Sequence, residues 1–176
     1  MSVYDLHNPQ HLENDLNNII SRLNEMYFIN IEKRPFEIFP RLTDTSGTFW
    51  ASAENNTEFN KLVPLFKNLH KDMYAFIESF SSLATGKKYD YTTFEIKYEN
   101  YREFRLMNNM FKHPNRKDLS ITLTKVCYLE QKQYDLMCNF HFPNGTFKCI
   151  GYAQFIQLFL TILVDWKAIK WKKMAI

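Results

Sequence analysis

Hydrophobic residues recur at steps of three and four along much of the chain, the spacing that places them on one face of a helix. The first such run predicts a helix over residues 9–28. The most regular run predicts a second helix that begins at Asn56 or Thr57 and stops at Gly86. Pro64 lies either in the first turn of this helix or at its true start. The apolar stripe of the second helix fits a dimer seam or an antiparallel neighbour within the chain, and it comprises Phe59, Leu62, Phe66, Leu69, Met73, Phe76, Phe80 and Leu83.

A third amphipathic run predicts a helix from about Tyr91 to His113, because Pro114 pushes the residue before it out of the helical region. Its apolar face is formed by Phe94, Tyr98, Tyr101, Phe104, Met107 or Asn108, and Phe111. The link after Gly86 is short and polar, so the second and third helices are expected to form an antiparallel hairpin. Glu95 and Glu99, four residues apart, are expected to be solvated surface.

After Lys117 the pattern changes to β-branched and aromatic residues, which predicts a three-stranded antiparallel meander. Its turns are expected near Lys132-Gln133 and at Asn144-Gly145, where the Asn-Gly pair accommodates positive φ angles. A fourth helix is predicted over residues 152–170. It is apolar nearly all round, which indicates burial on several sides, and its continuous apolar stretch is shorter than the roughly 20 residues of a membrane span.

The segment from Asn30 to Asn55 has neither the helical nor the strand period. Pro35, Pro40 and Gly47 break helices there, and large apolar residues remain available for packing. A loop of this length inside a compact domain is more often functional or self-packed than incidental. The segment is therefore expected to be an ordered loop over the core and is a candidate lid.

Length and composition indicate one domain, residues 1–176, with a bulky interior. A chain of roughly 150 residues buries about 68–70% of its unfolded surface, enough for a sizeable core. Sixteen Phe, ten Tyr and only four Gly indicate an aromatic-filled interior and long helices. The expected fold is mainly α: a four-helix bundle with a three-stranded antiparallel β-meander inserted before the last helix.

Charge and cysteine content narrow the classes of protein. The net charge of +3 is too small to imply nucleic-acid binding by itself, and the lysines around Trp166 and Trp171 are expected to form a solvated end. The polar N-terminus lacks the features of a signal peptide, which predicts a cytoplasmic protein. Cys127, Cys138 and Cys149 lack CxxC spacing and are expected to be reduced. No metal or cofactor motif is present, so no cofactor is expected.

Candidate chemistry gathers in the last turns of the third predicted helix, at Arg105, Asn108, Asn109, Lys112 and His113. The first four residues supply guanidinium, amide and ammonium donors that suit a phosphate. The histidine supplies a group that exchanges protons near neutral pH. A structural interpretation is also open, because the helix dipole by itself favours a cationic Lys112 and His113 at a C-terminus.

Four helices with a polar motif near the end of the third resemble the HEPN domain (higher eukaryotes and prokaryotes nucleotide-binding). The ribonucleases of that family carry an arginine, a polar residue, three other residues and then a histidine. The pattern falls here on residues 108–113 and matches the polar second position, Asn109, the spacing and His113. The first position is Asn108 instead of arginine, and an amide has no charge with which to hold a phosphate. Arg105, one turn earlier, is the expected substitute.

The resemblance implies a helical, commonly dimeric domain, often independent of metals and often found in bacterial toxin–antitoxin or phage-defence systems. We therefore expect a homodimer that binds RNA or a nucleotide through Asn108, Asn109 and Lys112. Any ribonuclease activity is expected to use His113 for proton transfer and Arg105 to hold the phosphate, and to be weak or lost because of Asn108. The alternative is a non-enzymatic dimeric interaction module that binds a partner protein. Neither interpretation involves a membrane.

Overall fold

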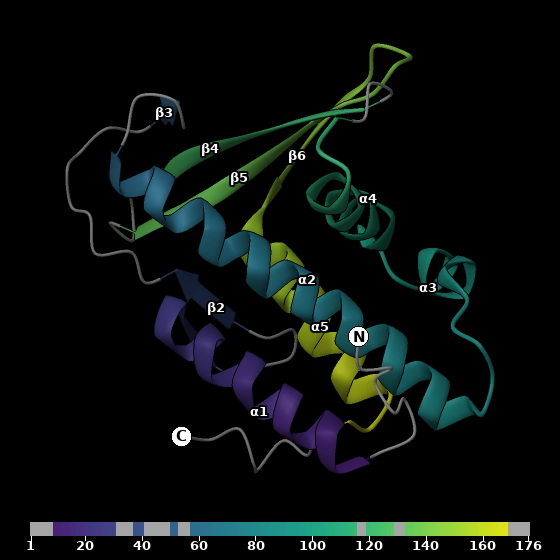
Figure 1. The fold of residues 1–176 in the computed structure, drawn as a ribbon. Coiled ribbons are helices and arrows are strands. Elements are labelled where there is room, and N and C mark those ends of the chain that lie inside the picture. The colour runs from purple at the N-terminus through teal and green to yellow at the C-terminus, as the bar shows by residue number, and fades with distance from the viewer. Residues whose placement is uncertain are drawn as a thin grey trace.

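Five helices and six strands make up the part of the chain that the structure describes. The protein is represented by a computed structural model, in which the described residues are 9–30, 37–40, 50–52, 57–115, 119–128 and 133–168. Helices α1 (Pro9–Met26) and α2 (Thr57–Thr85) confirm the first two predicted helices, and they lie side by side in opposite directions (Figure 1). Pro64 lies inside α2, about two turns after its start. Gly86 ends the helix at a φ of +65°.

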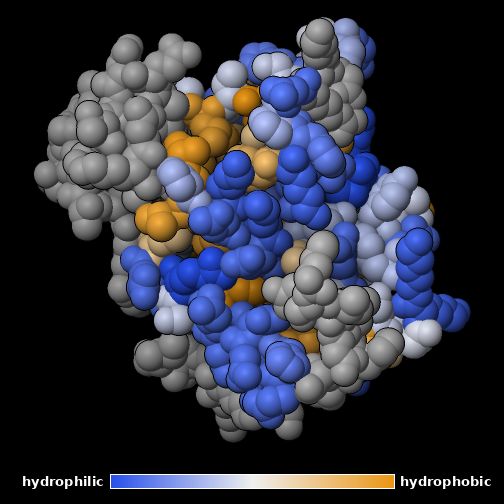
Figure 2. All heavy atoms as spheres, in the orientation of Figure 1, coloured by the Kyte–Doolittle hydropathy of each residue, from blue (hydrophilic) through white to orange (hydrophobic). Residues whose placement is uncertain are grey.

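The packing of α1 and α2 follows from their amphipathic patterns. On α1 the buried side chains recur at helical spacing, and they are Leu12, Leu16, Ile19 and Leu23. The middle of the α2 stripe is buried by other parts of the same chain, as Phe66, Leu69, Met73 and Phe76 show. An antiparallel neighbour within the chain therefore accounts for this part of the stripe without a second protomer. Figure 2 shows that hydrophilic residues cover much of the face of the molecule that carries α1.

The third helix is not continuous, and the prediction of a single element is wrong. The chain forms α3 (Tyr91–Lys97) and then α4 (Tyr101–Lys112). Between them Asn100 takes a φ of 66°, a left-handed conformation that asparagine adopts more readily than most residues. The hydroxyl of Tyr98 donates a hydrogen bond of 2.9 Å to Asp165, so the break is tied to the end of the last helix.

The predicted meander follows α4. Strands β4 (Ser120–Tyr128), β5 (Gln133–His141) and β6 (Phe147–Gly151) pair in antiparallel order. A short strand from the N-terminal half, β3 (Trp50–Ser52), pairs with the free edge of β4 and makes the sheet four-stranded. The predicted turn at Asn144-Gly145 is confirmed, with Gly145 at a φ of +84°.

The other predicted turn, near Lys132-Gln133, is not itself part of the described residues. Gln133 already belongs to β5 and pairs with Tyr128. The connection between β4 and β5 is therefore made by residues 129–132, slightly earlier than the sequence predicted.

Helix α5 (Tyr152–Asp165) begins directly after β6 and is buried along most of its length, as its apolar character predicts. It ends before the predicted residue 170, because Trp166 and Lys167 form a turn in which Lys167 has a φ of 57°. Aromatic residues dominate the core around it, and the fully buried ones include Phe66, Tyr101, Phe104, Phe140, Tyr152, Phe155 and Phe159. None of the described helices combines the length and the apolar character needed to cross a membrane.

Strands occupy parts of the segment that was predicted to be a loop. The strand β1 (Tyr27–Asn30) pairs with β2 (Glu37–Pro40), and β3 follows at residues 50–52. Strands of three or four residues are too short to show a period in the sequence. The rest of the candidate lid, residues 31–36, 41–49 and 53–56, lies outside the described residues.

The architecture is mainly helical, with an antiparallel sheet before the last helix. A four-helix bundle is not confirmed. In Figure 1, α1, α2 and α5 run alongside one another below the sheet, whereas the two shorter helices α3 and α4 lie together at one side. This arrangement places one face of α4 against α2 and α3, and that face carries the candidate site.

Candidate functional site

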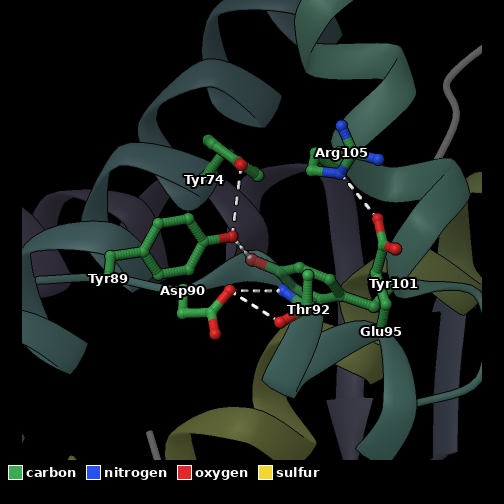
Figure 3. Close-up of polar contacts among 7 residues, drawn as sticks. All are labelled: Tyr74, Tyr89, Asp90, Thr92, Glu95, Tyr101 and Arg105. Carbon is green, nitrogen blue, oxygen red and sulfur yellow. Dashed lines mark hydrogen bonds and ion pairs between the residues drawn. The ribbon is translucent and has the colours of Figure 1, made fainter.

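Arg105 is held in a fixed position between α3 and α4. Its Nε donates a hydrogen bond of 2.6 Å to Oε1 of Glu95, and the two side chains are only 20% and 23% exposed. The guanidinium carbon lies 4.3 Å from the centroid of the Tyr91 ring, within the range of a cation–π contact. Figure 3 shows the two terminal nitrogens of Arg105 turned away from Glu95. The edge of the guanidinium that binds anions in a bidentate manner is therefore not used by these two partners.

Three tyrosine hydroxyls meet beside Arg105 (Figure 3). Tyr89, from the link between α2 and α3, donates to the hydroxyl of Tyr74 at 3.1 Å and lies 2.5 Å from the hydroxyl of Tyr101. Burial raises the pKa of all three phenols above the ordinary value of 10. These groups are neutral at pH 7 and act as hydrogen-bonding groups, not as bases.

Lys112 adds a second cation on the same face of α4. It follows Arg105 by seven residues, close to two helical turns, so both side chains leave α4 on one side. Its Nζ lies 5.9 Å from the centroid of the Tyr74 ring. Burial raises the pKa of Glu78, and the positive charge of Lys112 opposes that rise. Each cation of this face thus has a carboxylate as a neighbour.

The two asparagines of the predicted motif lie in different environments. Asn108 is 0% exposed, and neither atom of its amide has a hydrogen-bond partner among the described residues. A buried polar group left unpaired costs about 1–3 kcal/mol. Asn109 is only partly buried. The role of Asn108 in binding phosphate stays a prediction, since its side chain does not reach the surface of the chain described here.

His113 lies at the exposed end of α4. Its backbone N–H donates to the carbonyl of Asn109 at 2.8 Å, and Pro114 follows, so the predicted helix end is confirmed. Eight residues separate His113 from Arg105, which corresponds to about 12 Å along the helix axis and about 80° around it. Arg105 is held toward α3, so one chain does not bring the two side chains together. The catalytic role of His113 stays a prediction.

Two residues that the sequence analysis did not assign to the site complete it. Glu95 was expected to be solvated beside Glu99, but it pairs with Arg105. Tyr91, which is 44% exposed, supports the guanidinium. In an unbroken helix Glu95 and Arg105 would lie about 15 Å apart along the axis, too far to pair. The pair exists because the chain turns at Asn100, and the helical pattern contained no signal for that turn.

A groove between α1 and α2 carries the opposite charge. Arg22 pairs with Asp72 across it at 2.6 Å. Its polar lining also includes Asp15 and Glu78. Three carboxylates and one guanidinium give this groove a negative balance, which disfavours a phosphate. Among the described surfaces, the α4 face is therefore the better place for an anion.

His70, on the buried side of α2, has a structural environment. Its Nε2 lies 2.8 Å from the carbonyl of Phe104, and its Nδ1 lies 3.0 Å from the hydroxyl of Tyr152. A carbonyl only accepts hydrogen bonds, so Nε2 donates and Tyr152 donates to Nδ1. Burial lowers the pKa of His70 to about 4. The imidazole is neutral and links α2, α4 and α5.

Asp135, at the start of β5, is a second buried titratable group. One carboxylate oxygen accepts from the Tyr27 hydroxyl at 2.9 Å, and the other accepts from the backbone N–H of Ala153 at 3.0 Å. Burial raises the pKa of Asp135 to about 6, although these donors oppose the rise. The carboxylate joins β1, β5 and the first turn of α5, and it lies in the core.

Comparison of the chain with protein-family models, with curated proteins and with solved structures finds no match. Among the described residues, no three His, Cys, Asp or Glu side chains are grouped closely enough to hold a metal ion. The geometry of the α4 face is thus the basis for a functional proposal.

Proposed function

We propose that this protein binds a phosphate-bearing ligand, RNA or a nucleotide, at the face of α4 that carries Arg105 and Lys112. The observation that supports this most directly is the fixed guanidinium of Arg105, which is held by Glu95 and rests on Tyr91. A planar guanidinium suits the two oxygens of a phosphate. Because Arg105 is ordered in advance, binding costs less side-chain entropy than it would for a mobile arginine.

Lys112 and Asn109 supply further donors near the same face, and nearby carboxylates limit its positive potential. Glu95 and Glu78 lie beside the two cations. A ligand that contacts only two cations releases few counterions, so the logarithm of affinity should fall with the logarithm of salt at a slope of about −1.4 for a single strand. We therefore propose a specific, moderately salt-dependent contact in place of a broad electrostatic surface.

Binding without efficient cleavage is the form of the HEPN-like proposal that the geometry supports best. His113 lies well away from Arg105 on α4, and Asn108 is inside the fold. In a homodimer, which stays a prediction, the histidine of one protomer would approach the arginine of the other. A role in a bacterial defence or toxin–antitoxin system, in the cytoplasm, belongs to the same proposal, and the genes that neighbour this one would test it.

The alternative, a module that binds a partner protein, has less support. The large apolar side chains that are exposed in the described residues include Leu65, Ile96 and Phe147. They come from α2, α3 and β6, and single exposed apolar residues are common on protein surfaces. They do not argue for one particular docking surface.

Fluorescence anisotropy with a labelled single-stranded RNA tests the proposal. Arg105→Gln should weaken binding by about 10- to 150-fold, the loss of a charged hydrogen bond. Arg102→Gln is the matched control, because Arg102 is an exposed arginine on the same helix whose guanidinium lies 5.4 Å from the ring of Phe142. An affinity that Arg105→Gln leaves unchanged would overturn the proposal. Equal losses in both variants would reduce it to non-specific charge attraction.

A further inference from the structure

We infer that the ring of Tyr91 is a stacking platform for an unpaired base, so that the ligand of the α4 face is a single-stranded nucleic acid. This inference rests on the proposed function and names the class of its ligand. Tyr91 is 44% exposed, although most aromatic residues of the described chain are buried. Exposed aromatic rings beside cations are the common elements of sites that bind single strands.

The contact between Tyr91 and Arg105 makes the ring suitable for this role. Arg105 lies over one side of the ring, 4.3 Å from its centroid, so the exposed surface of Tyr91 belongs to the parts that Arg105 does not cover. The terminal nitrogens of Arg105 are turned away from Glu95, its partner on α3 (Figure 3). A nucleotide carries a flat base and a phosphate on one sugar. A ring and a guanidinium edge held next to each other match that pair of groups.

The neighbouring charges are compatible with a phosphate near Tyr91. Asp90, the residue before it, accepts hydrogen bonds from the backbone N–H of Thr92 at 3.0 Å and from its hydroxyl at 2.7 Å. Its carboxylate is therefore directed to the start of α3 (Figure 3). Lys87 and Lys88, in the same link, are exposed and supply cations for further phosphates of a strand.

A stacking role predicts selectivity among polyanions. In a duplex each base is stacked between its neighbours and its face is not available to a side chain. Inorganic polyphosphate has the charge but no base. A protein that uses Tyr91 in this way should bind single-stranded RNA more tightly than a duplex of the same sequence, and more tightly than polyphosphate of similar charge.

Anisotropy titrations of the full chain with these three probes test the inference. Tyr91→Phe keeps the ring and should retain the affinity for single-stranded RNA. Tyr91→Leu keeps apolar bulk but lacks a π face, and it should weaken RNA binding by about 5- to 150-fold while the affinity for polyphosphate changes little. Ile96→Ala, which removes the 88% exposed apolar residue of the same helix, is the control and should have no effect.

The outcomes separate this inference from the function on which it rests. If Tyr91→Leu weakens RNA and polyphosphate equally, Tyr91 acts only by supporting Arg105, and the stacking role is overturned while the phosphate site stands. If duplex and single strand bind equally well, the stacking role is also overturned. If neither RNA nor polyphosphate binds, or if Arg105→Gln changes neither affinity, the proposed function fails and the inference fails with it.

Discussion

His70 and Asp135 are both fully buried, and burial moves their pKa values in opposite directions. The pKa of His70 falls from 6.5 to about 4, so the unfolded chain binds more protons between these values and stability rises with pH. The pKa of Asp135 rises from 3.8 to about 6, so the folded chain binds more protons between these values and stability falls as pH rises. Each effect amounts to about 3 kcal/mol, and the two nearly cancel between pH 4 and 6.

Replacement of Asp135 should expose the contribution of His70. In Asp135→Asn the amide oxygen can still accept from Ala153, and the amide N–H can donate to the Tyr27 hydroxyl. Relative to the wild type, its free energy of unfolding should rise by about 3 kcal/mol more between pH 4 and 6.5. Urea denaturation at several pH values measures this difference. His70→Gln should give a difference of opposite sign, and parallel curves for all three proteins would contradict the assigned pKa values.

The buried amide of Asn108 makes a prediction about stability and binding together. Asn108→Leu removes a polar group that has no described partner and keeps a similar volume, so it should stabilise the fold by about 1 kcal/mol and raise Tm by about 2–4 °C. RNA affinity should not change, because the side chain is inside. Asn109→Leu, on the partly exposed neighbour, is the control and should not raise Tm. A loss of RNA affinity in Asn108→Leu would show that this residue reaches the ligand after all.

At the scale of elements, helical spacing predicted which residues are buried but not whether the backbone between them is continuous. Phe94, Tyr98 and Tyr101 were assigned to one apolar face, and all three are buried. The chain nevertheless breaks at Asn100, because a single left-handed residue leaves that apolar pattern intact. The cation Arg105 could therefore be predicted from the sequence, whereas its partners on α3 could not.

The break at Asn100 can be tested by two substitutions. Asn100→Ala places a residue without asparagine's tolerance at a φ of 66° and should destabilise the protein by about 1 kcal/mol. Asn100→Gly suits that conformation and should be close to neutral. Urea denaturation of both variants provides the comparison. If alanine were as stable as glycine, or more stable, the left-handed turn would not be the native conformation.

The strand register makes a prediction about the cysteines. Cys127 pairs with Tyr134 and Cys138 pairs with Leu123, so the two cysteines lie about 13 Å apart along the sheet, beyond the reach of a disulfide. Cys138 is a buried free thiol and Cys149 is an exposed one. Thiol titration of unfolded protein prepared without reductant should find three free groups. In the native state Cys149 should react much faster than Cys138, and a single free group after unfolding would contradict the register.

At the scale of the whole molecule, one chain covers most of the apolar surface on which a homodimer was predicted. The described side chains of the α2 stripe pack within the chain, and α5 is buried between α2 and the sheet. A second protomer is thus not required to hide these faces. It would be required for chemistry, because Arg105 and His113 do not meet within one chain.

Cleavage of RNA should therefore depend on dimers, whereas binding should not. Protein that sediments as a monomer is expected to bind single-stranded RNA through Arg105 without cleaving it, because His113 lies about 12 Å farther along α4. If dimers form at higher concentration, the rate of cleavage per protein molecule should rise with the dimer fraction. His113→Ala should then lower that rate by about 10²- to 10⁴-fold and leave RNA affinity unchanged. Sedimentation and cleavage measured on the same samples test both statements. Cleavage by the monomer at a rate per molecule that does not change with concentration would mean that His113 reaches the bound phosphate within a single chain.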